Sequence, residues 1–259
     1  MNRASPSREP PQHRIDAVVA FLRRTYDAHN ASAVIGVSGG IDSALALTLL
    51  CRALSPARVF PVLLPYHGQA MDDAVAICAW NDIPLSQCTT VNIGPLADAV
   101  FTELGIETAA TVRRGNVMAR VRMITLYDIA KRKAALVCGT ENKSEKSLGY
   151  FTRFGDGASD VEPIQHLYKT GVRVLATALA LPQSIITKAP TAGLWEGQTD
   201  EQELGFTYAE ADRVLEASLD RGLSREQIME KGISAMTVDA VLERVENQRF
   251  KHAVPYILE

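Results

Sequence analysis

The segment Ile35–Ser43 constrains the fold of this chain more than any other. It reads Ile-Gly-Val-Ser-Gly-Gly-Ile-Asp-Ser, the apolar run Ala33–Val37 leads into it, and the apolar segment Ala44–Leu54 follows. This order predicts a strand, a glycine turn and the N-terminus of a helix. Such a turn directs several backbone N–H groups at one point, and the helix dipole adds partial positive charge there. The segment therefore predicts a turn that binds an anion.

The side chains of this turn favour a phosphate held together with a metal ion. Gly39 and Gly40 let an anion approach the backbone without a Cβ in the way. Ser38 and Ser43 can add hydroxyl donors. Asp42 would repel a bare phosphate, so we expect a divalent cation between its carboxylate and the phosphate. The turn lacks the lysine of a Walker A loop and the third glycine of a Rossmann fingerprint. An ordinary glycine-rich βα turn is the alternative, and the nine-residue string argues against it.

The composition excludes several classes of protein. The chain has 259 residues and a net charge of −3, without a basic block long enough to follow a nucleic acid. It has no run of about 18 apolar residues, so we expect no membrane span. The cysteines lack metal-ligand spacing, and buried free thiols are typical of the reducing cytoplasm. We therefore expect a cytoplasmic protein that binds neither nucleic acid nor membrane.

The N-terminus predicts a short leader before a single domain. Met1–Gln12 is polar and rich in proline, and it lacks the apolar core of a signal peptide. We expect residues 1–13 to form a disordered leader and residues 14–259 to form one domain. A chain of this length buries enough surface for one substantial core.

Strands and helices alternate along the first half of the chain, which predicts an α/β fold with a doubly wound parallel sheet and helices on both faces. The expected strands are Ser32–Val37, Arg58–Leu64, Ser86–Asn92 and Ala135–Cys138. The expected helices are Arg14–His29, Ser43–Leu54, Met71–Asn81, Pro95–Leu104 and Asn116–Lys133, followed by a helical C-terminal segment over Tyr208–Leu219, Ser224–Lys231 and Met236–Phe250. Ligands of such sheets bind at the carboxyl ends of the strands.

The long helix Asn116–Lys133 carries apolar or small residues on more than one side. Val117, Val121 and Ile124 form one stripe, and a second stripe begins at Met123. A helix that is apolar on two faces is buried on both. The second face packs either against another helix of the same chain or against a second subunit, and the sequence leaves both interpretations open.

Five strings occur in an order that resembles ammonia-dependent NAD synthetases, which belong to the PP-loop ATP pyrophosphatases. These strings are Ser38–Ser43, Gly115–Met123, Gly139–Glu145, Gly155–Asp160 and Pro190–Trp195. The resemblance implies a Rossmann-like fold of the adenine nucleotide α-hydrolase type. It also implies a two-step reaction, in which ATP adenylates the nicotinate carboxylate of deamido-NAD with release of pyrophosphate. Ammonia then displaces AMP to give NAD. The implied cofactor is Mg²⁺, with ATP as co-substrate.

The resemblance further implies roles for individual residues. Those expected to bind ATP are Gly36, Val37, Ser38, Gly39, Gly40, Ile41, Asp42, Ser43, Thr140, Lys169 and Thr191. Asp42 and Glu145 would hold Mg²⁺, which takes its remaining ligands from phosphate oxygens and waters. Lys169 would neutralise charge as it shifts along the phosphates, and Asp156 would orient ammonia. Asp42, Lys169 and Asp156 are thus the expected catalytic residues.

The expected contacts to deamido-NAD come from residues that depart in part from the family pattern. They are Arg120, Arg153, Asp160 and Lys251. Many members have lysine at the position of Arg153, which preserves the charge but not the geometry. Phe250 stands where a histidine is common, so the expected histidine contact is lost or shifted to His252. Many members also read Asp-His-Ala-Ala where this chain has Glu-Asn-Lys-Ser before Glu145.

The expected partners are deamido-NAD, ATP and free ammonia, because no residues remain for a glutaminase domain and none of the cysteines lies in a recognisable nucleophile setting. The resemblance and the two-faced helix together predict a homodimer whose interface helps to form the deamido-NAD site. Two other functions stay open. One is a PP-loop pyrophosphatase with a different acceptor, either similar to GMP synthetase or acting on tRNA. The other is a module that binds ATP without turnover.

Overall fold

The computed structural model describes residues 9–191, 193, 197–253 and 255–256. Most of the expected leader, residues 1–13, lies outside these ranges. Helix α1 (Pro11–Ala28) begins within the last three residues of that leader. Proline suits the first turn of a helix, because its missing N–H would have no partner there. The helix therefore begins three residues earlier than expected.

Four parallel strands form the central sheet. They are β1 (Ser32–Gly36), β2 (Val59–Leu63), β3 (Thr89–Thr90) and β4 (Ala135–Cys138), in the spatial order β3-β2-β1-β4. The chain steps outward from β1 to β3 and then crosses back, so that β4 pairs with the other side of β1. The strand order therefore reverses between β1 and β4. In open sheets of this kind, the crevice at such a reversal is where ligands bind.

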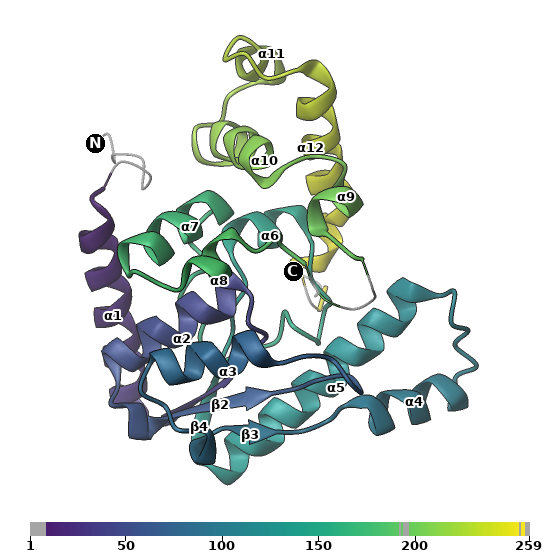
Figure 1. The fold of residues 1–259 in the computed structure, drawn as a ribbon. Coiled ribbons are helices and arrows are strands. Elements are labelled where there is room, and N and C mark those ends of the chain that lie inside the picture. The colour runs from purple at the N-terminus through teal and green to yellow at the C-terminus, as the bar shows by residue number, and fades with distance from the viewer. Residues whose placement is uncertain (1–8, 192, 194–196, 254, 257–259) are drawn as a thin grey trace.

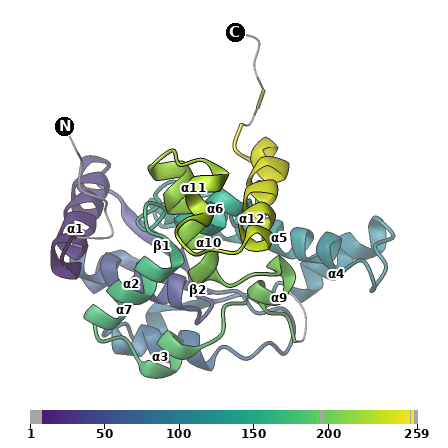
Figure 2. The same cartoon turned by 90° about the horizontal axis from the view of Figure 1, so that it is seen from above.

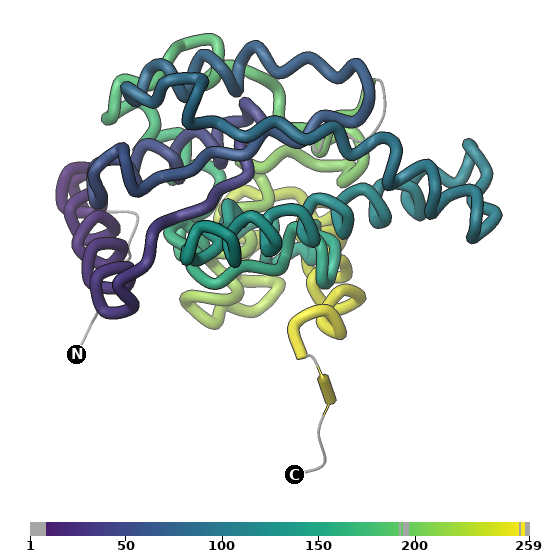
Figure 3. Tube along the Cα trace, turned by 90° about the horizontal axis from the view of Figure 1, so that it is seen from below, coloured from purple at the N-terminus to yellow at the C-terminus, as the bar shows by residue number. Residues whose placement is uncertain are grey.

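Alternate residues of the strands pack under two different layers of helices, which confirms the doubly wound α/β fold. Ala33 and Ile35 of β1 belong to a core that includes residues of α1, α2 (Ile41–Ala53), α3 (Asp72–Trp80), α7 (Lys169–Ala178) and α8 (Gln183–Thr187). Val34 points the other way, into a core with α4 (Gly94–Glu103) and α5 (Thr111–Arg132). Figure 1 shows the sheet between these layers, and Figure 3 shows α4 and the start of α5 projecting from one side.

Helix α6 and the part of the chain after residue 199 add a helical layer above the sheet, as Figures 1 and 2 show. It has its own core, to which Leu148, Tyr208 and Val241 contribute. Its elements are α6 (Lys143–Leu148), α10 (Tyr208–Leu215), a π-helical segment (Glu216–Asp220), α11 (Arg225–Met229) and α12 (Ala235–Gln248), with α9 (Asp200–Leu204) beside them. Among the residues described, no helix is both long and apolar enough to cross a membrane.

Three local expectations differ from the structure. The third strand spans only Thr89–Thr90, because the 3₁₀ turn Leu85–Gln87 takes up the start of the expected segment. Helix α5 begins at Thr111 instead of Asn116, since Gly115 is buried inside the helix and does not end it. Helices α6, α7 and α8 lie in the segment that the sequence marked only by its polar strings.

Candidate active site

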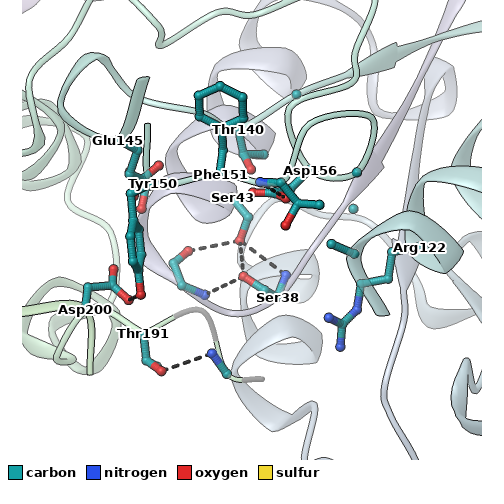
Figure 4. Close-up of a pocket in the computed structure, with 18 of the residues that line it drawn as sticks. Ser38, Ser43, Arg122, Thr140, Glu145, Tyr150, Phe151, Asp156, Thr191 and Asp200 are labelled. Carbon is teal, nitrogen blue, oxygen red and sulfur yellow. Dashed lines mark hydrogen bonds between the residues drawn. The ribbon is translucent and has the colours of Figure 1, made fainter. Parts of the chain in front are cut away.

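A cavity of about 600 Å³ lies at the carboxyl ends of the strands. Its walls come from the turn after β1, from the loop after β4, from one face of α5, and from residues of the C-terminal layer. Figure 4 shows this pocket, with Ser38 and Ser43 on one wall, Arg122 on another and Glu145 and Asp200 opposite. The pocket therefore opens at the switch point of the sheet, and we call it the active-site pocket.

The glycine turn is held in shape by its own hydroxyl groups. Ser43 Oγ donates to the Gly40 carbonyl at 3.0 Å and accepts from the Ser38 N–H at 3.3 Å, while the Gly40 N–H donates to Ser38 Oγ at 3.2 Å. Gly39 has a φ of +79°, and a Cβ at this position would lie 2.6 Å from Asp73 Cβ. Only glycine fits both conditions. All the residues expected to bind ATP line the pocket, except Gly39, whose Cα faces Asp73 of α3.

Lys169 joins the two carboxylates that the sequence marked as metal ligands. Its Nζ donates to Asp42 Oδ2 at 2.6 Å and to Glu145 Oε1 at 3.0 Å. The Lys169 side chain is only 3% exposed. Three residues that lie up to 127 positions apart in the chain thus meet at the N-terminal end of α2.

The local sequence explains why these side chains converge. Asn142 caps α6 through a capping box: its Oδ1 accepts from the Glu145 N–H at 3.0 Å, and Glu145 Oε2 accepts from the Asn142 N–H. The Asn142 side-chain amide also donates to Asp42 Oδ1 at 2.9 Å. At the start of α7, Ser144 Oγ accepts from the Lys169 N–H and Asp212 Oδ2 accepts from the Thr170 N–H. Helices α2, α6 and α7 are therefore fixed to one another at the site.

The charges of this group depend on one another. Burial lowers the pKa of Lys169, but Asp42 and Glu145 outweigh it, so the pKa lies above its usual value and the group is an ammonium. Burial raises the pKa of Glu145, while the charge of Lys169 opposes that shift. The Lys169 ammonium thus lies in contact with two carboxyl groups, of which the buried Glu145 holds its proton more tightly than usual.

The donor set fits Mg²⁺ with help from a ligand. Carboxylate oxygens are what Mg²⁺ prefers, and it keeps several waters or phosphate oxygens. Asp42 and Glu145 already converge on a cation, since both contact the Lys169 ammonium. Within the described ranges no group of three or more His, Cys, Asp and Glu side chains could hold a metal ion. The remaining ligands would therefore come from the nucleotide and from water.

Two of the residues expected at the acceptor end line the pocket. Asp156 accepts a hydrogen bond from the Thr152 N–H at 2.9 Å, and burial raises the pKa of its carboxyl group. Lys251 donates to the carbonyls of Gly149 and Phe151 at 2.6 and 2.9 Å. Both side chains line the active-site pocket. Their positions depend on contacts with the segment Gly149–Thr152, which the sequence alone does not reveal.

Three other expected residues are absent from the described pocket lining. Arg120 is exposed on α5. Asp160 accepts from the Val137 N–H at 2.7 Å and so fixes the loop after β4. Arg153 lies over the rings of Phe154 and Phe250, 5.8 and 5.5 Å from their centres. Within one chain, the structure therefore does not bring these three to the other site residues.

Several polar residues of the pocket were not predicted from the sequence, among them Arg122 and Asp200. Arg122 lies on the pocket face of α5, donates to the Leu64 carbonyl at 3.1 Å and to Gln69 Oε1 at 3.2 Å, and burial lowers its pKa. Asp200 is buried and accepts from the hydroxyls of Tyr150 and Tyr208, each at 3.2 Å. Helical spacing along α5 could have found Arg122, whereas nothing local marks Asp200.

Comparisons with known proteins agree with this geometry. A family model described as NAD synthase matches residues 14–255. The NH(3)-dependent NAD(+) synthetase of Methanosarcina mazei is 42% identical over 258 residues, which cover 97% of this chain and 98% of that relative. The corresponding protein of Chlorobium phaeobacteroides (strain BS1) is 43% identical over 246 residues, covering 93% of this chain and 87% of its own.

Two solved structures are similar along their whole length. The NMN synthetase from Francisella tularensis shares 32% identity with a TM-score of 0.84, covering 97% of this chain and 99% of that one. The NH3-dependent NAD synthetase from Campylobacter jejuni shares 31% identity with a TM-score of 0.81, covering 97% and 100%. By sequence, by fold and by the match over nearly all of its length, the chain belongs to the NAD synthase family.

Proposed function

We propose that this protein is an ATP-dependent ligase that amidates deamido-NAD with free ammonia to give NAD, AMP and pyrophosphate. The observation that supports this best is the group formed by Lys169, Asp42 and Glu145 at the N-terminus of α2. It places one cation and two carboxylates beside the glycine turn. This combination suits the triphosphate of ATP with a bound metal ion.

The chemistry explains why ATP is needed. A resting carboxylate resists ammonia because its oxygens carry negative charge and oxide is a poor leaving group. In the first step an oxygen of the nicotinate carboxylate bonds to the α phosphorus of ATP, and the bond from that phosphorus to the pyrophosphate breaks. In the second step the nitrogen of ammonia bonds to the acyl carbon, AMP leaves with the electrons of the C–O bond, and the nitrogen gives up a proton.

The protein contributes positioning and charge. The backbone N–H groups of Ser38–Ser43 would hold the departing pyrophosphate at the positive end of α2. Lys169 would neutralise negative charge on the phosphates during transfer, a form of stabilisation that works best in a site closed to water. Asp42 and Glu145 would hold Mg²⁺, whose charge lowers the repulsion between the phosphates and the incoming carboxylate. Asp156 would orient ammonia.

A second acceptor follows from one comparison. The Francisella tularensis relative is named an NMN synthetase, and its TM-score of 0.84 is higher than the 0.81 of the Campylobacter jejuni relative. The same two steps on a nicotinate mononucleotide would give NMN in place of NAD. Both acceptors carry the same reacting carboxylate, so the group around Lys169 serves either one.

We also propose that the protein forms a homodimer and acts in the cytoplasm. Arg120 and Ile124 lie on the exposed side of α5, away from the pocket of their own chain. In a homodimer that pairs this face with a second copy, Arg120 could reach the acceptor held by its partner. Arg153 and Asp160 stay proposed acceptor residues on the ground of the family resemblance alone.

The direct test is to incubate the purified protein with ATP, Mg²⁺, ammonium and each acceptor, and to separate the nucleotide products. We expect AMP together with NAD, and the ratio of the two kcat/KM values ranks the acceptors. Formation of ADP, or of no amide from either acceptor, would contradict the proposal.

The variants Asp42→Asn and Glu145→Gln should each lower turnover by about 10²-fold or more, since each removes a stabilising charge. Full activity in both would remove the metal assignment.

A further inference from the structure

Two cationic side chains from the C-terminal end of the chain line the active-site pocket. Arg244 belongs to α12, and Lys251 follows it in the 3₁₀ turn Arg249–Lys251. Helix α12 packs closely on the end of α6, because a Cβ on Gly149 would lie 2.3 Å from Gln248 Cβ. Arg244 and Gln248 are four residues apart and therefore lie on the same face of α12, the one that lines the pocket.

Backbone carbonyls hold these two cations in place. Arg244 Nε donates to the Leu148 carbonyl at 3.1 Å. Lys251 Nζ donates to the carbonyls of Gly149 and Phe151 at 2.6 and 2.9 Å. The three carbonyls belong to one stretch of four residues, so the guanidinium and the ammonium lie close together at the end of α6. We call Arg244 and Lys251 the cation pair.

The cation pair is fixed and still has unused hydrogen-bond donors. The Arg244 guanidinium lies 5.6 Å from the centre of the Tyr150 ring, a distance that suits a cation–π contact. A guanidinium has five N–H donors and an ammonium has three. Within the part of the chain that the structure describes, Arg244 uses one donor and Lys251 uses two, and neither side chain forms an ion pair with a carboxylate.

The charges of the cation pair favour an anion beside it. Burial lowers the pKa of Lys251 and the positive charge of Arg244 lowers it further, while Asp156 opposes that shift. An anion in contact with both cations would offset their repulsion. A phosphate fits best, because arginine binds it through two parallel N–H groups and lysine binds it as a point charge.

The cation pair lies beside the group proposed to bind the triphosphate, at the other end of α6. Glu145 contacts Lys169, and Leu148 holds Arg244 three residues later on the same helix. At 1.5 Å per residue these two positions are about 4.5 Å apart along the helix axis. Both ends of α6 line the same pocket. A substrate that reacts near Lys169 could therefore place a phosphate of its own on the cation pair.

We propose that Arg244 and Lys251 bind the phosphate on the ribose of the acceptor, which makes Arg244 a further residue that determines acceptor affinity. This inference rests on the proposed function. Both acceptors, deamido-NAD and nicotinate mononucleotide, carry a phosphate on the ribose that is attached to the pyridine ring, and the reacting carboxylate lies on that ring. The cation pair therefore serves either acceptor. The phosphates of ATP have the same chemistry, so the experiment must separate the two sources.

The test compares wild type with Arg244→Gln and Lys251→Gln by the rate of AMP formation at saturating ammonium. The KM for each acceptor should rise about tenfold or more, the scale of one lost hydrogen bond to a charged group. The KM for ATP should stay within about twofold. The loss should appear in the KM for the acceptor instead of in kcat, because this phosphate does not react. Arg244→Lys keeps the charge and should lose less than Arg244→Gln.

Two further measurements sharpen the test. Side chains that contact one group are not additive, so the double variant should raise the KM for the acceptor by less than the product of the two single effects. Nicotinate riboside lacks the phosphate, and its inhibition constant should be the same for wild type and Arg244→Gln.

Arg249→Gln is the matched control. It removes one positive charge from the same segment, but Arg249 is exposed, forms an ion pair with Glu246 and is outside the described pocket lining. Its KM values for the acceptor and for ATP should equal those of wild type.

Several results would overturn the inference. An unchanged KM for the acceptor in Arg244→Gln would remove Arg244 from the acceptor site. A larger rise in the KM for ATP would assign the cation pair to the triphosphate, and equal rises for both substrates would show a merely structural role. Weaker inhibition of Arg244→Gln by the riboside would show a contact with another part of the acceptor. Failure of the proposed function is distinguishable, because wild type would then form no AMP from either acceptor.

Discussion

Gly39 has a positive φ and close backbone neighbours, so its replacement tests how strictly the turn is built. In Gly39→Ala the new Cβ would meet Asp73 Cβ at 2.6 Å and the Ala74 N–H group at 2.9 Å. The left-handed conformation adds about 1–2 kcal/mol of strain for a residue with a Cβ. We expect a fall in the free energy of unfolding of roughly 2 kcal/mol or more, measured by denaturant unfolding without nucleotide.

Gly40→Ala is the matched control for this prediction. Gly40 has an extended backbone, and a Cβ there would meet only Ser38 Oγ, at 3.3 Å. Its unfolding free energy should therefore stay within about 0.5 kcal/mol of wild type, as for an ordinary surface substitution. If both variants lose the same stability, the strain argument for Gly39 is wrong.

Glu162 predicts a pH dependence of stability. Its pKa is about 7 in the folded protein and 4.5 as the ordinary value, so the native state holds the proton more tightly than the unfolded state. This contribution is fully present below about pH 4.5 and is lost as the pH rises through 7. The loss amounts to roughly 3 kcal/mol, since each pKa unit corresponds to about 1.36 kcal/mol.

Denaturant unfolding of wild type and Glu162→Gln between pH 5 and pH 8.5 measures this contribution. The two proteins share every other titratable group, so the difference between their curves isolates Glu162. The difference should change with pH in the direction that makes wild type relatively less stable at high pH. A difference that is constant across the range would show that Glu162 titrates normally.

At the scale of elements, the start of the short helix α6 holds two residues of the candidate site in place. Asn142 caps it, holds the Glu145 N–H and contacts Asp42. In Asn142→Ala we expect a loss of about 1 kcal/mol of stability from the missing cap. Turnover should fall as well, because Asp42 and Glu145 lose a shared fixing point.

Thr207→Ala is the matched control for the α6 prediction. Thr207 caps α10 through the same kind of capping box, and it lies outside the described pocket lining. Its loss of stability should be similar, while its kcat stays at the wild-type value. Equal losses of kcat in the two variants would mean that α6 acts through stability alone. The measurements are urea unfolding and the rate of AMP formation.

The elements that sequence could predict are those whose causes are local. The turn after β1 needs Gly39 at a positive φ, and this requirement is visible in the string itself. The start of α7 was not predictable in this way, because its N–H groups are held by Ser144 and by Asp212, which lies 42 residues beyond Thr170. Strand β3 was predicted too long, since only Thr89–Thr90 pair with β2.

The same distinction applies to the candidate site. Asp42 and Glu145 were marked by their strings, and the structure brings both to Lys169. Asp200 was missed because its importance comes only from its tertiary neighbours Tyr150 and Tyr208.

At the scale of the whole molecule, α4 and the start of α5 form an arm that projects from the rest of the fold (Figure 3). Large apolar residues on this arm are exposed, among them Leu104, Val112 and Ile124, each by more than 60%. Val112 also lines the active-site pocket, whereas Ile124 lies outside the described pocket lining, so Ile124 is the residue that suits a contact with another molecule. We propose that the side of α5 that exposes Ile124 pairs with another copy of the chain, and Arg120 lies on that side one helical turn before Ile124.

The variant Ile124→Glu tests this arrangement. A carboxylate placed in an apolar interface is buried without a partner, which costs several kcal/mol, so we expect a dimer to dissociate at assay concentration. Light scattering should then give a mass near 28.2 kDa, against twice that value for wild type. The KM for the acceptor should rise while the KM for ATP changes less, because Arg120 would leave the partner's pocket. Val174→Glu is the control, since Val174 is also exposed but lies on α7. A wild-type protein that is monomeric and fully active would contradict the dimer, and the acceptor would then have to bind without Arg120.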